Sequence, residues 1–178
     1  QTGGGLLIPG ADELYPPAYS AGARVYSNSW GSYFPRGSTG YYYGEDADKF
    51  LFEHPMLAVF FSAGNAGNDG DYTLNMHASS KNIVAVGSSE STAREDQSPN
   101  SQDISYVSFF SSQGPTYDGR HKPDLVAPGD TLVSAQASGS DSEQTCSTTE
   151  KMGTSMACPA CAGTALLVRQ YFKDLNRG

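Results

Sequence analysis

Three short, unbroken runs of apolar residues limit the fold of this 178-residue chain more than any other feature. They read MLAVFFSAG at residues 56–64, NIVAVGS at 82–88 and DLVAP at 124–128. A strand with one solvated face alternates apolar and polar residues, whereas an unbroken run needs both faces covered, as in a parallel sheet between helices. RVYSNSW at 24–30 predicts a further strand. We therefore expect an α/β fold with a mostly parallel sheet flanked by helices.

Three other segments carry helix signals. Residues 45–54 begin with acidic residues and end with a histidine, which is the charge order that a helix dipole favours. Residues 11–23 predict a helix that Pro16 and Pro17 must kink or delay. Residues 154–175 begin with small residues and become amphipathic only near their end. We expect the first half of that helix to be fully buried.

Length and charge exclude several classes of protein. A chain of this length suits a single domain that can bury a sizeable core. The formal net charge of -8 argues against a nucleic-acid partner, which would require a basic surface. No apolar run approaches the ~20 residues of a transmembrane helix. We therefore expect neither nucleic-acid binding nor a membrane span.

Small polar residues gather at the ends of the expected strands. SNSWG at 27–31, SAGN at 62–65 and APG at 127–129 follow three of them, and the last helix begins with GTS at 153–155. The carboxyl ends of parallel strands lie at one edge of a sheet, which is where α/β proteins bind their ligands. The sequence therefore predicts a site at this edge.

Ser155 and Asn65 are the two residues of this edge that could carry chemistry. Serine at a helix start is a common capping residue, but a serine there is also placed for nucleophilic attack, because helix amides stabilise an oxyanion. Gly153, Ala157 and Ala160 are small enough to let a substrate backbone approach. Asn65 could simply form a turn, or its carboxamide could donate a hydrogen bond to the same oxyanion.

The motifs GTSMACP, FFSAGN, NSWG, NIVAVGS and FSSQGP with RHKPDLVAPG occur in the order and approximate spacing of the subtilisin-like serine proteases, or subtilases. The chain resembles this family from about residue 7 to residue 178. AGARVYSNSWG and FSSQGPTYDGRHKPDLVAPG look closest to the large alkaline subtilases whose catalytic domain precedes a β-sandwich. The resemblance implies a three-layer subtilisin-like fold, of which this chain would be a part.

The resemblance also implies roles for individual residues. Ser155 matches the nucleophile, and Asn65 matches the side chain of the oxyanion hole, with the Ser155 amide as the second donor. One segment of the chain matches the family's edge strand, which pairs with substrate and forms one wall of the first specificity pocket. A second segment matches the opposite wall of that pocket. These walls are Ser29, Trp30 and Gly31, and then Ser62, Ala63 and Gly64. Trp30 could instead be a core residue or a lid over an apolar subsite, and its neighbours in the sequence favour the subsite.

The catalytic base and acid of the family have no match in this sequence. Its histidines occur as His54-Pro55, His77-Ala78 and His121-Lys122, not in the family's His-Gly-Thr setting, and no aspartate lies in an Asp-Thr/Ser-Gly setting. We therefore expect residues 1–178 to be the C-terminal portion of a subtilase peptidase domain that lacks its Asp- and His-bearing part. Such a chain should be inactive alone. The alternative is a pseudoprotease or interaction module on the same scaffold.

The remaining expectations concern ligands and location. The resemblance implies a polypeptide substrate, the missing N-terminal part as a partner, no required cofactor, and a secreted or lumenal location. Asp124 matches an acid that binds a structural cation in some relatives, but one carboxylate does not support a calcium site, and we favour an ion pair or cap. Cys158 and Cys161 are interpreted as core residues rather than a metal or redox pair. Ala66 offers no charge beside Asn65, which favours apolar or aromatic substrate side chains.

Overall fold

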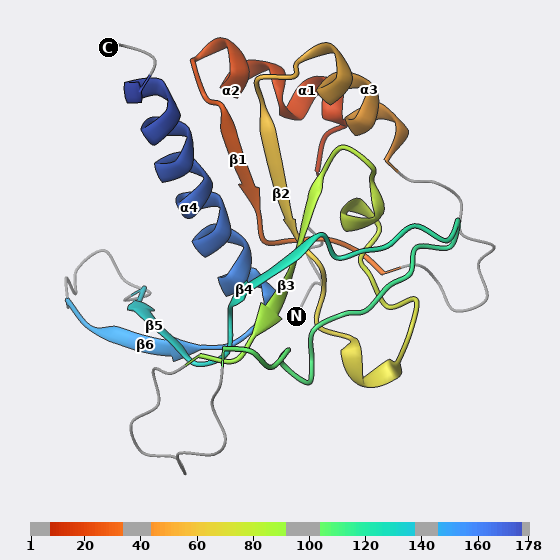
Figure 1. Ribbon diagram of the computed structural model, residues 1–178, viewed down its shortest axis with the longest axis vertical. Coiled ribbons are helices and arrows are strands. Elements are labelled where there is room, and N and C mark those ends of the chain that lie inside the picture. The colour runs from red at the N-terminus through yellow and green to blue at the C-terminus, as the bar shows by residue number, and fades with distance from the viewer. Residues whose placement is uncertain (1–7, 34–43, 92–103, 138–145, 176–178) are drawn as a thin grey trace, which may run out of the picture.

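A four-stranded parallel sheet forms the centre of the computed structural model, which describes residues 8–33, 44–91, 104–137 and 146–175 (Figure 1). Neighbouring strands pair in the order β1-β2-β3-β4, every pair is parallel, and β1 and β4 form the two edges. This confirms the fold class and the strands that were expected from the apolar runs. The strands are β1 (Val25–Asn28), β2 (Ala58–Ser62), β3 (Val84–Ser89) and β4 (Leu125–Pro128).

Both faces of the sheet are covered, which gives three layers. On one face, Val59 and Phe61 of β2 pack in a buried cluster with Tyr15 and with Leu51 of α3. On the other face, Phe60 packs against the long helix α4. The alternation of neighbouring β2 side chains between two cores explains why the run is apolar throughout. The helices are α1 (Ala11–Leu14), α2 (Pro16–Ser20), α3 (Glu45–Glu53) and α4 (Thr154–Leu175).

Short elements complete the structure around the sheet. An antiparallel hairpin of β5 (Leu132–Ala135) and β6 (Thr148–Lys151) lies between β4 and α4 in the chain. Two 3-10 helices, η1 (Gly67–Asp69) and η2 (His77–Ser79), lie between β2 and β3. No helix of the described residues is long and apolar enough to cross a bilayer.

Two helices differ from their sequence-based predictions. The predicted helix 11–23 is split into α1 and α2 at Tyr15, because α2 restarts with Pro16 in its first turn, where the missing N–H costs nothing. The first half of α4 is not fully buried, so that expectation was wrong. Ala157 and Cys158 face the sheet, whereas Ala160 on the opposite side is exposed. Small residues permit close packing, but a helix on one face of a sheet buries only one stripe.

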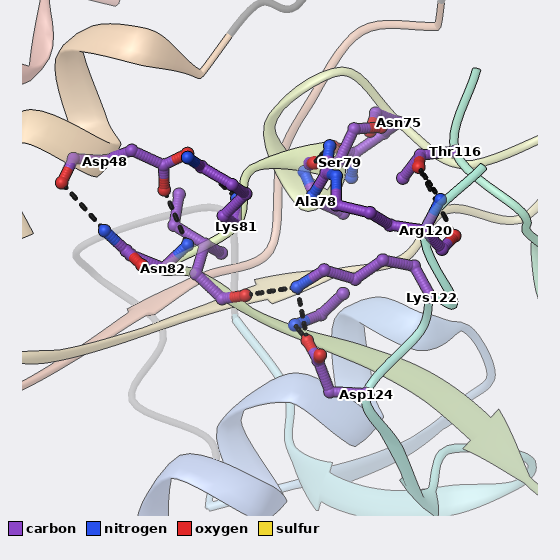
Figure 2. A network of polar contacts seen from close by, with 12 residues as sticks. Asp48, Asn75, Ala78, Ser79, Lys81, Asn82, Thr116, Arg120, Lys122 and Asp124 are labelled. Atoms are coloured by element: carbon purple, nitrogen blue, oxygen red, sulfur yellow. Dashed lines mark hydrogen bonds and ion pairs between the residues drawn. The ribbon is translucent and has the colours of Figure 1, made fainter. Parts of the chain in front are cut away.

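A buried lysine ties the beginnings of β3 and β4 together (Figure 2). The Lys122 side chain is only 3% exposed, and its Nζ lies 2.6 Å from the Ile83 carbonyl oxygen and 2.6 Å from Asp124 Oδ2. The same Asp124 oxygen accepts the Ala85 N–H at 2.7 Å. Asp124 is therefore held by an ammonium group and a backbone amide. The contact sets the register of the two strands whose far ends approach the predicted site.

Further side chains anchor the loops before β3 (Figure 2). The Asp48 carboxylate on α3 accepts the backbone N–H groups of Lys81 and Asn82 at 2.9 and 2.5 Å. The guanidinium of Arg120 donates to the Ser79 carbonyl at 2.8 Å. These bonds satisfy backbone groups that a covered loop would otherwise leave without partners.

Replacing Lys122 with methionine should lower the free energy of unfolding by about 3 kcal/mol, because the Ile83 carbonyl and the Asp124 carboxylate both lose the bond from the ammonium group, and Asp124 keeps only the Ala85 N–H. This loss of stability is at the low end of the range for breaking a buried ion pair, because the Asp124 side chain is 38% exposed. Urea-induced unfolding measures the change. Lys49→Met, at an exposed position of α3, is the matched control and should shift the midpoint little. Equal shifts for the two variants would contradict this account of Lys122.

Candidate active site

Ser155 is the second residue of α4 and does not cap it with its side chain. The cap position belongs to Gly153, whose carbonyl accepts the Met156 N–H at 2.9 Å and whose φ of 145° suits glycine. The Ser155 hydroxyl instead lies 3.5 Å from the Ser29 carbonyl oxygen, and the Ser155 N–H has no acceptor within the described residues. The half-buried hydroxyl is therefore presented beside a helix amide that is available to a ligand.

A proline in α4 explains a second contact of Ser155. Pro159 stands inside the helix and lacks the N–H that would otherwise bond the carbonyl four residues earlier, which is that of Ser155. The hydroxyl of Ser29 donates to this carbonyl at 2.7 Å instead. The end of β1 and the beginning of α4 are thereby joined at the serine.

Asn65, which follows β2, is oriented by Thr154. Its Oδ1 accepts both the backbone N–H and the hydroxyl of Thr154, each at 2.9 Å. The Thr154 hydroxyl in turn accepts the Gly64 N–H at 3.2 Å. A backbone N–H can only donate, so Oδ1 must face Thr154, and the Nδ2 amino group is the end of the carboxamide left for another acceptor. Asn65 itself is exposed, whereas Thr154 is 1% exposed.

A small cleft of about 210 Å³ lies between the ends of β1 and β2. Five of the six predicted wall residues line it together with Asn65 and Ser155, and Ala63 does not. Ala63 is buried, with its N–H bonded to Val86 and its carbonyl to Asn75. The wall residues in the cleft are Ser29, Trp30, Gly31, Ser62 and Gly64.

The indole of Trp30 belongs to the core as well as to the cleft. Its ring packs edge-on against Phe61 and His77, with centroids 4.8 Å apart in each case. Trp30 therefore supports the wall from behind, which matches the core alternative for this residue.

A larger cavity of about 670 Å³ also borders Ser155. It is lined by the hairpin β5-β6, including Val133 and Lys151, and by Met156 and Pro159 of α4. Ser155 is thus reached from the small cleft and from this large cavity.

Comparison with known proteins identifies the family of this chain. The model of the Subtilase family matches residues 6–177. The chain belongs to the subtilase family. Over 91% of this chain, the sequence is 29% identical to the serine protease/ABC transporter B family protein tagD of Dictyostelium discoideum. Over 67% of this chain, it is 37% identical to the serine protease AprX of Bacillus subtilis (strain 168). It spans only 13% and 27% of these two relatives.

A solved structure supports the fold of this subtilase chain. A lanthipeptide protease is similar to it with a TM-score of 0.62 and 21% sequence identity, over 91% of this chain and 51% of that one. The resemblance stated from the motifs is therefore confirmed for the family and for the fold.

None of the three histidines of this subtilase chain lines the small cleft or the large cavity. His54 stacks on Phe50, and His77 packs behind the cleft wall against Phe61. His121 borders a separate cavity beside β4. The described residues that line the two spaces around Ser155 thus include no histidine.

Of the two cysteines near Ser155, Cys158 belongs to the core and Cys161 packs half-buried against it. Cys158 is buried and its Sγ lies 3.5 Å from the Asn28 carbonyl. Burial raises the pKa of Cys158, and it also raises the pKa of Cys161, so neither thiol favours the thiolate that metal or redox chemistry needs. The described residues contain no group of three or more His, Cys, Asp or Glu side chains that could hold a metal ion.

Sequence reasoning missed three residues of the site: Tyr33, Asn75 and Thr154. Thr154 had a signal, since it precedes the serine in GTS. Tyr33 and Asn75 lie in loops and are paired by an isolated β-bridge, which no local sequence pattern predicts.

His77 should make the stability of the chain depend on pH. Burial lowers its pKa, so the unfolded chain binds more protons than the folded chain as the pH falls below about 6.5. The free energy of unfolding should be highest above that pH and should decrease on acidification. Urea unfolding at pH 7.5 and 5.5 should show this loss reduced in His77→Phe but retained in His121→Gln, which changes an exposed histidine. The same pH dependence in His77→Phe would refute the prediction.

Proposed function

We propose that this chain carries the nucleophile and the oxyanion hole of a serine endopeptidase that hydrolyses peptide bonds. The observation that carries the proposal is the pair of bonds from Thr154 to Asn65 Oδ1, at 2.9 Å each. They leave Nδ2 of Asn65 and the N–H of Ser155 as two donors at the beginning of one helix. Membership of the subtilase family, and relatives named serine proteases, support the same reaction.

In this mechanism the Ser155 Oγ attacks the carbonyl carbon of the scissile bond while its proton passes to a base. The carbonyl oxygen becomes an oxyanion, which accepts hydrogen bonds from Asn65 Nδ2 and the Ser155 amide. The C–N bond then breaks, and the base returns its proton to the leaving amine. Water, deprotonated by the same base, attacks the acyl-enzyme, and Ser155 is regenerated. The reaction uses side chains and water and requires no cofactor.

Substrate would lie as an extended chain against residues 29–31, as the family resemblance implies. Its side chain before the scissile bond would enter the small cleft, with residues 62–64 as the opposite wall. The exposed backbone of Gly31 lets the substrate approach closely.

The base and its orienting acid are proposed to come from residues outside this sequence. The large cavity beside Ser155 offers space for a segment that bears them. Without it, the hydroxyl of Ser155 keeps its proton, so the isolated chain should be inactive. Residues 1–178 would then be the C-terminal portion of a peptidase domain. From the family resemblance we also expect a secreted or lumenal location.

Complementation tests this proposal. The isolated chain, the full-length protein, and the isolated chain mixed with the segment that precedes it should be compared on a fluorogenic peptide. Hydrolysis is expected in the second and third cases only. Hydrolysis by the isolated chain that survives Ser155→Ala would reject the assignment. No hydrolysis by the full-length protein would favour the alternative, a pseudoprotease that retains the scaffold.

A further inference from the structure

Tyr33 lies across the small cleft from one wall to the other. It follows the wall 29–31 in the chain, and its hydroxyl oxygen accepts the backbone N–H of Asn65 at 2.7 Å. A methyl group added to Gly64 would lie 3.0 Å from Cε1 of the Tyr33 ring and 3.1 Å from the Tyr33 hydroxyl oxygen. The phenol therefore fills space directly against the second wall, and Gly64, with φ of 115°, leaves just enough room for it.

Asn75 closes the cleft behind the first wall. Its side chain is 3% exposed, donates to the Ser62 carbonyl and accepts the Ala78 N–H at 2.9 Å. A methyl group on Gly31 would lie 2.7 Å from its Cγ. This fixed carboxamide cannot withdraw to admit a large group without breaking both bonds.

The groups that line the remaining space are small and polar. Apart from Trp30, whose ring packs in the core, the lining residues are glycine or carry hydroxyl or carboxamide groups. An aromatic side chain placed there would desolvate these groups without giving them hydrogen bonds. The apolar or aromatic preference expected from Ala66 is thus opposed by Tyr33 and by the lining.

We propose that Tyr33 is a specificity-determining residue that restricts the residue before the scissile bond to a small side chain, such as alanine or serine, and excludes aromatic ones. The inference rests on the proposed function, because it assigns the small cleft to that side chain. The Tyr33 oxygen accepts from Asn65, so its own proton can be donated into the cleft. A serine hydroxyl of the substrate would find a partner there.

The test uses the full-length protein and two peptides that differ only in having alanine or phenylalanine before the scissile bond. The wild type should prefer alanine at least about tenfold in kcat/KM, and Tyr33→Ala should shift the ratio at least about tenfold toward phenylalanine. Tyr33→Phe keeps the ring and should keep the preference. Tyr106→Ala, at another exposed tyrosine that lies outside the cleft, is the control. If Tyr33→Ala does not fold, Tyr33→Leu, which is smaller than tyrosine and still apolar, replaces it.

A wild type that cleaves after phenylalanine as well as after alanine, or a ratio unchanged by shortening Tyr33, would overturn the inference. Equilibrium binding of both peptides to Ser155→Ala separates it from the proposed function. Tighter binding of the alanine peptide by about tenfold, lost in Tyr33→Ala, supports the inference even if the protein hydrolyses nothing. Equal binding of the two peptides counts against the inference even if hydrolysis is observed.

Discussion

Alanine in place of Ser155 should lower kcat of the full-length protein by about 10⁶, to the residual rate that binding and the oxyanion donors sustain. In the proposed mechanism the acyl-enzyme forms on this hydroxyl, so its removal leaves the reaction without its nucleophile. Hydrolysis of a fluorogenic peptide measures the loss. Unfolding should change little, because the hydroxyl makes one long bond of 3.5 Å to Ser29.

The matched control for this change is Ser20→Ala, which alters an exposed serine at the end of α2 and should keep full activity. A Ser155→Ala protein that retains more than a small fraction of the wild-type rate would show that another residue is the nucleophile.

Asn65→Ala should lower kcat by about 10²–10³ and change KM little, because the oxyanion that Nδ2 stabilises exists only in the transition state. Steady-state kinetics over a range of peptide concentrations separates the two constants. Thr154→Val removes one of the two donors that orient Asn65 and leaves the backbone N–H, so we expect a smaller loss, about tenfold. A rise in KM at constant kcat for Asn65→Ala would place this side chain in ground-state binding instead.

The fold was largely predictable because the unbroken apolar runs of β2 and β3 indicate strands that are covered on both faces. Val59, Phe60 and Phe61 can all be apolar only if both faces of the strand are covered. The burial of α4 was not predictable in the same way. Alanine and glycine are compatible with close packing and with solvent, and Ala157 and Ala160 look alike in sequence but lie on opposite sides of the helix.

The part of the candidate site that lies at the carboxyl ends of the parallel strands was predictable, because these ends meet at one edge of the sheet. Ser29 and Asn65 follow β1 and β2, and Ser155 lies in the first turn of α4, so the order and direction of these elements bring the three residues together. Tyr33 and Asn75 could not be found in this way, since they enter the cleft from loops through the contact of two distant segments. The sequence gives no sign of the contact at Pro159 either, because only the fold brings the Ser29 hydroxyl to the carbonyl that the proline leaves without a helical partner.

Covalent labelling of the full-length protein with a fluorophosphonate is the sharpest test of whether Ser155 is an activated nucleophile. An activated serine oxygen forms a bond to phosphorus, fluoride leaves, and the serine proton is taken up by the base. We expect one adduct per molecule, located on Ser155 by mass spectrometry, and none on the isolated chain or on Ser155→Ala. A full-length protein with Ser155 unlabelled, or labelled on a different serine, would contradict this role of Ser155.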